Sequence, residues 1–133
     1  SCLLVKRKYL KKYEKKRIQI ANKFINEFKK FKIELPPKFS SSQHIYHKFV
    51  IQTQNRDKLK DFLNKRGIET LIHYKYPIPK LSLFNKKTIN YKTPNANYLS
   101  KNSLSLPIHP YLKNSEVNFI IKTVKKFFKK IDL

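Results

Sequence analysis

The sequence contains a single glycine, Gly67, among its 133 residues. Glycine-rich loops hold phosphate groups because residues without a side chain let backbone N–H groups approach the ligand closely. This chain can therefore form neither a P-loop nor the GxGxxG turn of dinucleotide-binding proteins. A phosphate-bearing ligand must be held by other groups or by another segment. The sequence also has no methionine, and we expect it to be a piece of a longer protein.

The formal charge of +23 raises nucleic acid and anionic membranes as partners. However, only four of the 31 basic residues are arginines, which nucleic-acid-binding proteins favour for bidentate contacts. The basic residues are spread from Lys6 to Lys130, and lysine, asparagine and isoleucine are together typical of AT-rich coding sequences. We expect most of this charge to lie on solvated faces, with no nucleic-acid partner. The alternative is a stand-alone basic module that binds nucleic acid or another anionic surface.

No apolar run approaches the roughly eighteen residues that a membrane-spanning helix needs, so we expect no membrane partner. The first residues also lack the order of a signal peptide, in which basic residues precede a longer apolar stretch. The one cysteine, Cys2, cannot form a disulfide within the chain. These features fit a cytoplasmic protein.

Residues 3–32 carry apolar side chains at a helical period, while lysines dominate the opposite face. The stripe consists of Leu3, Leu10, Tyr13, Ile20, Phe24, Phe28 and Phe31, with Arg17 as its one charged member. Pro36 and Pro37 then stop the helix. We expect an amphipathic helix packed against a core, with Leu3, Leu4 and Leu10 uncovered in this piece of the protein.

The segments 44–53 and 68–73 are rich in β-branched and aromatic residues and predict two strands. Between them, residues 56–66 predict a helix with Asn55 as its N-cap. Gly67 stands at the end of this helix, where a left-handed backbone is commonly required. Helices and strands thus alternate, which indicates an α/β chain.

Residues 74–94 contain three prolines and predict an irregular loop. A helix through residue 102 and a short extended segment over 104–110 follow. Asn114 then caps a final amphipathic helix with Glu116 in its first turn.

Few residues offer chemistry. His44 and His47 are three apart, which on a strand places them on opposite faces and argues against a metal site. His73 and Tyr74 end a strand at the mouth of a proline-rich loop, where polar groups commonly meet ligands. The alternative for His73 is a structural role, in which its side chain only satisfies a local hydrogen bond. We expect such a structural role for His109. No complete catalytic set stands out among the eight acidic residues.

Two stretches in this order resemble one family: GIETLIHYKYPIP over 67–79 and LSLPIHPYL over 104–112, followed by the closing amphipathic helix. They are similar to the C-terminal part of the DegT/DnrJ/StrS family of pyridoxal phosphate (PLP)-dependent nucleotide-sugar aminotransferases. LLVKRKYLKKYEKKRIQIANKF resembles the long connecting helix of that family, and YHKFVIQTQNRDKLKDFL its next strand and helix. The resemblance covers nearly the whole chain. TLIHY most resembles the branch that aminates dTDP-linked keto-deoxysugars, often at C3.

The resemblance implies a homodimer of the type I aminotransferase fold. It implies that residues 1–133 form one small C-terminal α+β domain, a long helix followed by a mostly antiparallel sheet with helices on one face. Residues 1–35 would be the connecting helix and 36–133 the sheet and helices. In the family the Schiff-base lysine and the other PLP-binding groups belong to a larger upstream domain. No catalytic, cofactor-binding or metal-binding residue is therefore expected in this chain, and the chain alone is expected to be inactive.

The activity implied is transfer of an amino group from glutamate to a nucleotide-linked keto-deoxysugar, for cell-surface polysaccharide or glycoconjugate biosynthesis. His73 and Tyr74 match the family's His-Tyr pair, which borders the sugar-nucleotide site, and His47 matches a supporting histidine. The family often has HYPxPxH, whereas here Pro79 or Lys80 occupies the later histidine position. Some relatives replace the catalytic lysine by histidine and dehydrate sugars, so this segment leaves the reaction type open.

Overall fold

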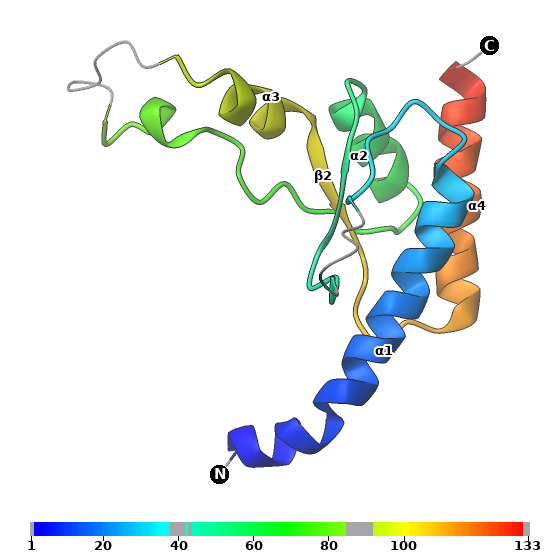
Figure 1. The fold of residues 1–133 in the computed structure, drawn as a ribbon. Helices are drawn as coiled ribbons and strands as arrows, with labels where there is room; N and C mark the ends of the chain where they lie inside the picture. Colours follow the sequence, from blue (N-terminus) through cyan, green and yellow to red (C-terminus); the bar gives the residue numbers. More distant parts are fainter. Residues whose placement is uncertain (1, 38–41, 43, 85–91, 132–133) are drawn as a thin grey trace.

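The computed structural model describes residues 2–37, 42, 44–84 and 92–131. The elements are, in chain order, α1 (Cys2–Phe28), β1 (Phe49–Gln52), α2 (Arg56–Asn64), the 3-10 helix η1 (Ile78–Lys80), α3 (Pro94–Asn102), β2 (Ser103–Leu106) and α4 (Asn114–Ile131). In Figure 1, α1, α2 and α4 lie to one side of the strands, while η1 and α3 extend away from them. The predicted α+β class, with its long N-terminal helix, is confirmed.

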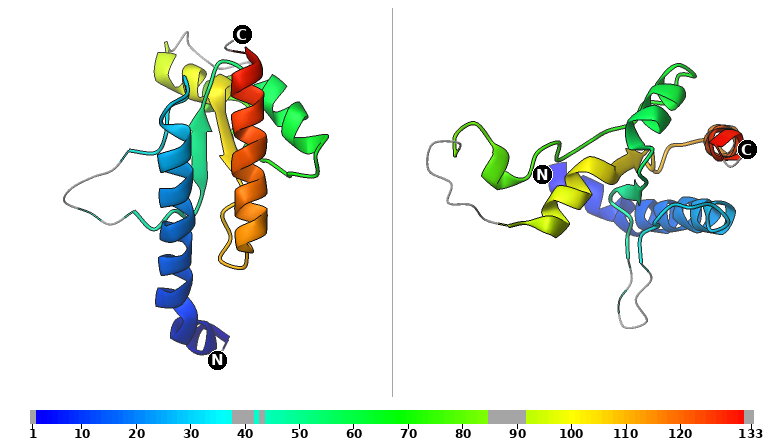
Figure 2. Two further views of the ribbon diagram at one scale, coloured as in Figure 1. Left: turned by 90° about the vertical axis from the view of Figure 1, so that its right-hand side faces the viewer. Right: turned by 90° about the horizontal axis from the view of Figure 1, so that it is seen from above.

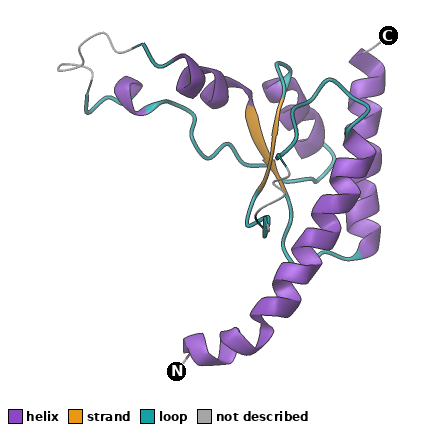
Figure 3. Ribbon diagram, viewed as in Figure 1, coloured by secondary structure: helices purple, strands orange, loops and turns teal. Residues whose placement is uncertain are grey.

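The two strands form an antiparallel pair, one face of which belongs to the core. Phe49 lies opposite Leu106 and Ile51 opposite Leu104, and all four side chains are buried. Because side chains alternate between the two faces of a strand, these four share one face of the sheet. Helices cover this face (Figure 3), and the rings of Phe24 in α1 and Phe49 lie 5.2 Å apart. The prediction of an antiparallel sheet with helices on one face is confirmed.

Single bridges widen the sheet at both edges. Glu34 pairs with Gln52 beside β1, and Leu71 pairs with Ser105 beside β2. The predicted strand over 68–73 is therefore wrong as a continuous strand, since only Leu71 exchanges backbone hydrogen bonds with Ser105, at 3.2 and 2.9 Å. The residues on either side of Leu71 leave the ladder, as edge segments do when one short strand is their only neighbour.

The other predicted strand begins at Phe49, not at residue 44. Tyr46 has a φ of 50°, a left-handed conformation that interrupts an extended strand. Its N–H donates a hydrogen bond to Nδ1 of His44 at 2.9 Å, which stabilises a local turn. The aromatic and β-branched residues over 44–48 therefore form the approach to β1 and not its first half.

Only the second half of α1 belongs to the core. Leu3, Leu4 and Leu10 are exposed, as predicted. The buried positions of the helix are Ile20, Ala21, Phe24 and Phe28. α1 ends at Phe28 instead of at residue 32, because the N–H of Phe31 bonds to the carbonyl of Phe28 at 3.0 Å and tightens the turn.

α2 occupies the predicted place, but its N-cap differs from the prediction. The Asn55 side chain makes no capping hydrogen bond. Instead, the Thr53 hydroxyl accepts a hydrogen bond from the Asn55 N–H at 3.3 Å, and the Thr53 carbonyl accepts one from the Arg56 N–H at 3.2 Å. Thr53 thus organises the turn that starts the helix, while Leu59 and Leu63 bury its inner face.

The end of α2 explains the single glycine. Gly67 has a φ of 73°. Its N–H bonds to the carbonyl of Asn64 at 3.0 Å, and the N–H of Ile68 bonds to the carbonyl of Leu63 at 3.1 Å. These two hydrogen bonds define a Schellman motif, in which glycine takes the left-handed position. The predicted role of Gly67 is confirmed.

α3 lies where the sequence predicts it, and α4 begins at Asn114 with a different cap from the one predicted. The carboxylate of Glu116 accepts a hydrogen bond from the Lys113 N–H at 2.6 Å, and the Lys113 carbonyl accepts one from Val117 at 3.0 Å. Lys113 is thus the N-cap residue, and Glu116 reaches back to it as in a capping box. The expectation that the Asn114 side chain caps this helix is wrong.

α1 and α4 pack against each other beside the strands (Figure 2). The rings of Phe31 and Phe128 lie 5.6 Å apart, and Lys125 Nζ lies 2.6 Å from Glu27 Oε2. The hydrogen bond from Lys125 lowers the pKa of Glu27. Within the described part of the chain, no helix combines the length and apolar character needed to cross a membrane.

The two faces of the sheet predict losses of different size for the same substitution. Leu104 is 0% exposed on the covered face, whereas Leu71 is 54% exposed on the open side. We expect Leu104→Ala to lower the free energy of unfolding by about 2–5 kcal/mol, because it removes contacts and leaves a cavity. Leu71→Ala should cost far less. Urea unfolding of both variants tests this difference, and equal losses would contradict the assignment of the faces.

Gly67 gives a second prediction. A Cβ at this position would meet no atom within 4 Å, so only the backbone conformation opposes a side chain. We expect Gly67→Ala to cost about 1–2 kcal/mol of unfolding free energy. Gly67→Asn should cost less, because asparagine tolerates the left-handed region. Chemical denaturation of the two variants measures the difference, and a larger loss for asparagine would argue for steric crowding instead.

Candidate functional site

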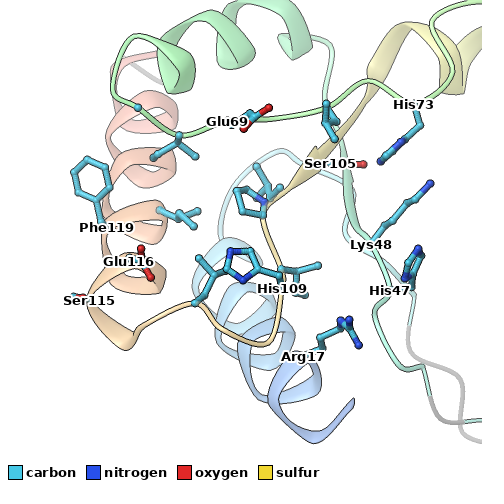
Figure 4. Close-up of a pocket in the computed structure, with 18 residues that line it drawn as sticks. Arg17, His47, Lys48, Glu69, His73, Ser105, His109, Ser115, Glu116 and Phe119 are labelled. Atoms are coloured by element: carbon cyan, nitrogen blue, oxygen red, sulfur yellow. The ribbon is translucent and has the colours of Figure 1, made fainter. Parts of the chain in front are cut away.

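A cleft of about 1090 Å³ lies beside the open side of the sheet. Its walls come from α1, the approach to β1, the segment that follows α2, the β2–α4 connection and the first turns of α4. In Figure 4 four basic side chains lie along one side of it: Arg17, His47, Lys48 and His73. The opposite side carries Glu69, Ser115, Glu116 and Phe119, with His109 between the two sides. The cleft is thus divided into a basic wall and a wall with two carboxylates.

A second cavity of about 470 Å³ adjoins this cleft. It lies between the open face of the sheet, the 71–78 segment and α3, and Tyr74, Tyr76 and Leu99 give it an apolar lining. The two cavities share four lining residues: Lys48, Leu71, His73 and Ser105. They therefore form one continuous surface, with these four residues at the junction.

The register of the sheet explains why these residues meet. Val50 pairs with Ser105, and Ser105 also pairs with Leu71 on its other side. Residues two apart on a strand point to the same face. Lys48 directly precedes β1 and His73 follows Leu71 by two residues, and both line the two cavities at this point. The floor of the site is the face of the sheet opposite the buried Phe49 side.

The structure places His73 and Tyr74 differently from each other. His73 lines both cavities, whereas Tyr74 lines only the smaller one and is 78% exposed. Both are surface residues of the segment that leaves the sheet after Leu71. His47 was expected to support the strand, but it is exposed and lines the cleft beside Lys48.

Sequence reasoning missed two residues of this cleft. Lys48 was one lysine among many, although its place directly before the buried Phe49 put it on the open face. His109 was expected to be structural but is an exposed residue of the cleft. Arg17 did carry a signal, because it interrupts the apolar stripe of α1. No group of three or more histidine, cysteine, aspartate or glutamate side chains within the described ranges could hold a metal ion.

Arg56 holds the outer wall of the smaller cavity in place. Its guanidinium is buried, and Nη1 donates a hydrogen bond to the carbonyl of Ser100 near the end of α3 at 3.0 Å. Nε lies 2.7 Å from Oδ1 of Asp57. Tyr98, also in α3, donates a hydrogen bond from its hydroxyl to Oε1 of Glu34 at 2.6 Å, and this hydrogen bond raises the pKa of Tyr98. These bonds fix α3 against the sheet.

The fold and the sequence have known relatives. A family model described as the DegT/DnrJ/EryC1/StrS aminotransferase family matches residues 1–125. The chain belongs to this family. The dTDP-3-amino-3,6-dideoxy-alpha-D-galactopyranose transaminase of Aneurinibacillus thermoaerophilus is 27% identical over 125 residues, covering 94% of this chain and 34% of the relative. The resemblance stated from the sequence is therefore confirmed.

Solved structures agree with this assignment. DesV of S. venezuelae, solved in complex with a ketimine intermediate, has a TM-score of 0.89 and 26% identity, covering 95% of this chain and 34% of that chain. A protein of Streptococcus pneumoniae solved in a PLP-form has a TM-score of 0.85 and 26% identity, covering 96% of this chain and 34% of that chain. This family member thus spans about a third of the length of these relatives.

The described residues do not themselves fit PLP. The only glycine, Gly67, ends α2 and its N–H is bonded to Asn64, so it cannot join a backbone cradle for the cofactor phosphate. The N-terminus of α4 faces the cleft, and Glu116 places a carboxylate there. A phosphate at that end would meet a like charge. We assign no cofactor-binding residue to this part of the chain.

The Arg56 contact leads to a stability prediction. We expect Arg56→Leu to lower the free energy of unfolding by about 1–3 kcal/mol, because it leaves the buried carbonyl of Ser100 without its donor. Arg66→Leu is the matched control, since Arg66 is exposed and bonds to the nearby Phe62 carbonyl of α2. Denaturant unfolding compares the two variants. Similar losses would mean that the buried contact has no special role.

Proposed function

We propose that this chain is the C-terminal segment of an enzyme that transfers an amino group from glutamate to a nucleotide-linked keto-deoxysugar. The observation that carries the proposal is the family match over residues 1–125, combined with a cleft on the open side of the sheet. Membership of this family favours an aminotransferase over the alternative, a stand-alone basic module. The enzyme would act in the cytoplasm, and its product would serve the biosynthesis of a cell-surface polysaccharide or glycoconjugate.

In this proposal residues 1–35 connect to an upstream domain that holds PLP, and residues 36–133 supply part of the sugar-nucleotide site. PLP provides the electron sink that amino-group transfer needs. The whole enzyme acts as a homodimer. The name of the Aneurinibacillus relative supports a dTDP-linked substrate and amination at C3.

His73 and Tyr74 form the substrate wall in this proposal. An imidazole N–H can donate a hydrogen bond to a sugar hydroxyl or a phosphate oxygen, and a phenol can donate while its ring packs on a hexose. The smaller cavity offers this arrangement, because Tyr74 and Tyr76 line it together with Leu99. Pro77 is buried at its margin and restrains the segment that carries these side chains.

The test uses the full-length protein that contains this chain. We expect His73→Asn or Tyr74→Phe to lower kcat/KM for the keto sugar by about three- to a hundred-fold, because each removes a hydrogen bond to substrate. The reaction with glutamate should change much less, since the amino donor is too small to need this wall. Measuring amino-sugar formation and 2-oxoglutarate release in separate single-turnover reactions distinguishes the two.

His44→Asn is the control, because His44 lies outside both cavities. Equal losses in the two reactions for His73→Asn would show that the residue acts through folding or the cofactor. The assignment of His73 and Tyr74 to the substrate wall would then have to be abandoned.

A further inference from the structure

The first half of α1 carries the densest positive charge of the chain. Residues 6–17 comprise six lysines and two arginines, with Glu14 as the one acidic residue among them. The two ion pairs found among the described residues lie elsewhere, at Asp57 and at Glu27. This part of the helix extends beyond the strands in Figure 1. Its charge is therefore largely uncompensated by the described residues.

Three tyrosines form an aromatic cluster on this part of α1. The rings of Tyr9 and Tyr13 are stacked with their centres 6.0 Å apart. The ring of Tyr111, from the β2–α4 connection, meets that of Tyr13 edge-on at 5.4 Å, and the two hydroxyls share a hydrogen bond of 2.6 Å. Tyr9 and Tyr111 are nevertheless exposed. The central ring thus holds the two outer rings in place while much of their surface faces solvent.

A hollow of about 490 Å³ lies at this cluster, and we call it the tyrosine hollow. Its walls combine the three rings with Lys12, Lys15 and Lys16. The tyrosine hollow shares no lining residue with the cleft or with the smaller cavity. It is therefore a surface separate from the site proposed for the sugar nucleotide.

Exposed aromatic rings beside lysines are the groups with which proteins bind single-stranded nucleic acids. Bases stack on the rings, while the basic side chains follow the phosphates of the backbone. Rings that are already held in place lose little freedom when a base stacks on them. A paired base is stacked within its own helix, so such a surface favours unpaired bases, which RNA presents in loops and at its ends.

The scarcity of arginine, from which the sequence predicts no nucleic-acid partner, does not argue against this mode of binding. Arginine is favoured where bidentate hydrogen bonds read the edges of bases. Stacking reads no base edge, because every base has a flat face that a tyrosine ring can cover. Lysine neutralises a phosphate as a point charge, which is sufficient to hold the backbone.

We propose that the tyrosine hollow binds single-stranded RNA. Bases stack on the exposed rings of Tyr9 and Tyr111, and the three lysines of the hollow contact the adjoining phosphates. This function is additional to the proposed amino-group transfer and does not depend on it, because the two surfaces have no lining residue in common.

Fluorescence anisotropy of a labelled oligoadenylate of about twelve nucleotides, titrated with the full-length protein, tests this surface. Tyr9→Leu should weaken binding by about five- to a hundredfold, because it removes one stacking ring. Tyr9→Phe keeps the ring and should retain most of the affinity. Phe119→Leu is the matched control, since Phe119 is 49% exposed against 47% for Tyr9 and lies outside the tyrosine hollow. An unchanged unfolding midpoint shows that each variant is folded.

The lysines give a second, independent measurement. Each phosphate contact to a single strand contributes about 0.7 to the slope of log affinity against log salt concentration. Replacing Lys12 and Lys16 together by glutamine should therefore make this slope shallower by about 1.4. Replacing Lys122 and Lys126 by glutamine is the matched control, because these lysines have the same spacing on α4 and are exposed outside the tyrosine hollow. Equal changes of slope in the two double variants would overturn the proposal.

An abasic strand with the same number of phosphates separates stacking from charge. We expect it to bind more weakly than oligoadenylate, and we expect Tyr9→Leu not to weaken it further. Equal affinities for the two strands would overturn the proposal, because charge alone would then explain binding. So would equal losses of oligoadenylate affinity in Tyr9→Leu and Phe119→Leu, or a loss in Tyr9→Phe as large as in Tyr9→Leu.

Two further titrations separate this surface from a membrane site and from the cleft. Binding to vesicles of phosphatidylcholine and phosphatidylglycerol should not depend on Tyr9. A loss of vesicle binding in Tyr9→Leu as large as the loss of RNA binding would assign the surface to an anionic membrane and overturn the proposal. Saturating dTDP should leave RNA binding unchanged, and displacement of the oligonucleotide by dTDP would place RNA in the cleft instead.

RNA binding requires neither PLP nor a keto sugar, so the two functions can fail separately. RNA binding that depends on Tyr9 in a protein that aminates no sugar would leave this inference standing and reject the proposed function. An active aminotransferase whose RNA affinity ignores Tyr9 would retain the proposed function and reject the inference.

Discussion

The antiparallel pairing of β1 with β2 is the constraint on which the rest of this structure depends. Its register sets Phe49 and Ile51 against Leu106 and Leu104 on the face that the helices cover. The alternate residues are thereby committed to the open face. A shift of one residue would exchange the two sets, so the same register that fills the core also places Val50 and Ser105 on the open face.

Sequence patterns predicted the helices better than the strands, and the reason is physical. A helix forms its hydrogen bonds within one segment, so its apolar period and its ending at Gly67 are visible locally. A strand depends on a partner elsewhere in the chain. Residues 68–73 have strand-like composition, yet only Leu71 pairs with another segment. Tyr46 adopts a left-handed conformation before β1, and because it is not a glycine the sequence does not indicate this conformation.

The candidate site divides in the same way. His73 and Tyr74 were predicted because they end a segment of strand-like composition before a proline-rich loop, and because they match the family's His-Tyr pair. Lys48 was not predicted, because the chain contains many lysines and the composition does not distinguish one from another. What distinguishes it is its alternation with Phe49, which becomes informative only once the covered face is known. Arg17 did stand out from its helix, but nothing in the sequence connected it with β1.

The scarcity of glycine and the row of basic side chains are connected. Backbone cradles for phosphate need residues that let N–H groups converge on the ligand, and the one glycine of this chain is required for the end of α2. Helix dipoles offer another solution, but Glu116 places negative charge at the start of α4, where it faces the cleft. Charged side chains are what remains on this surface for holding an anion. An open sheet face beside α1 can present them together, because the face opposite its apolar core is free to carry polar residues.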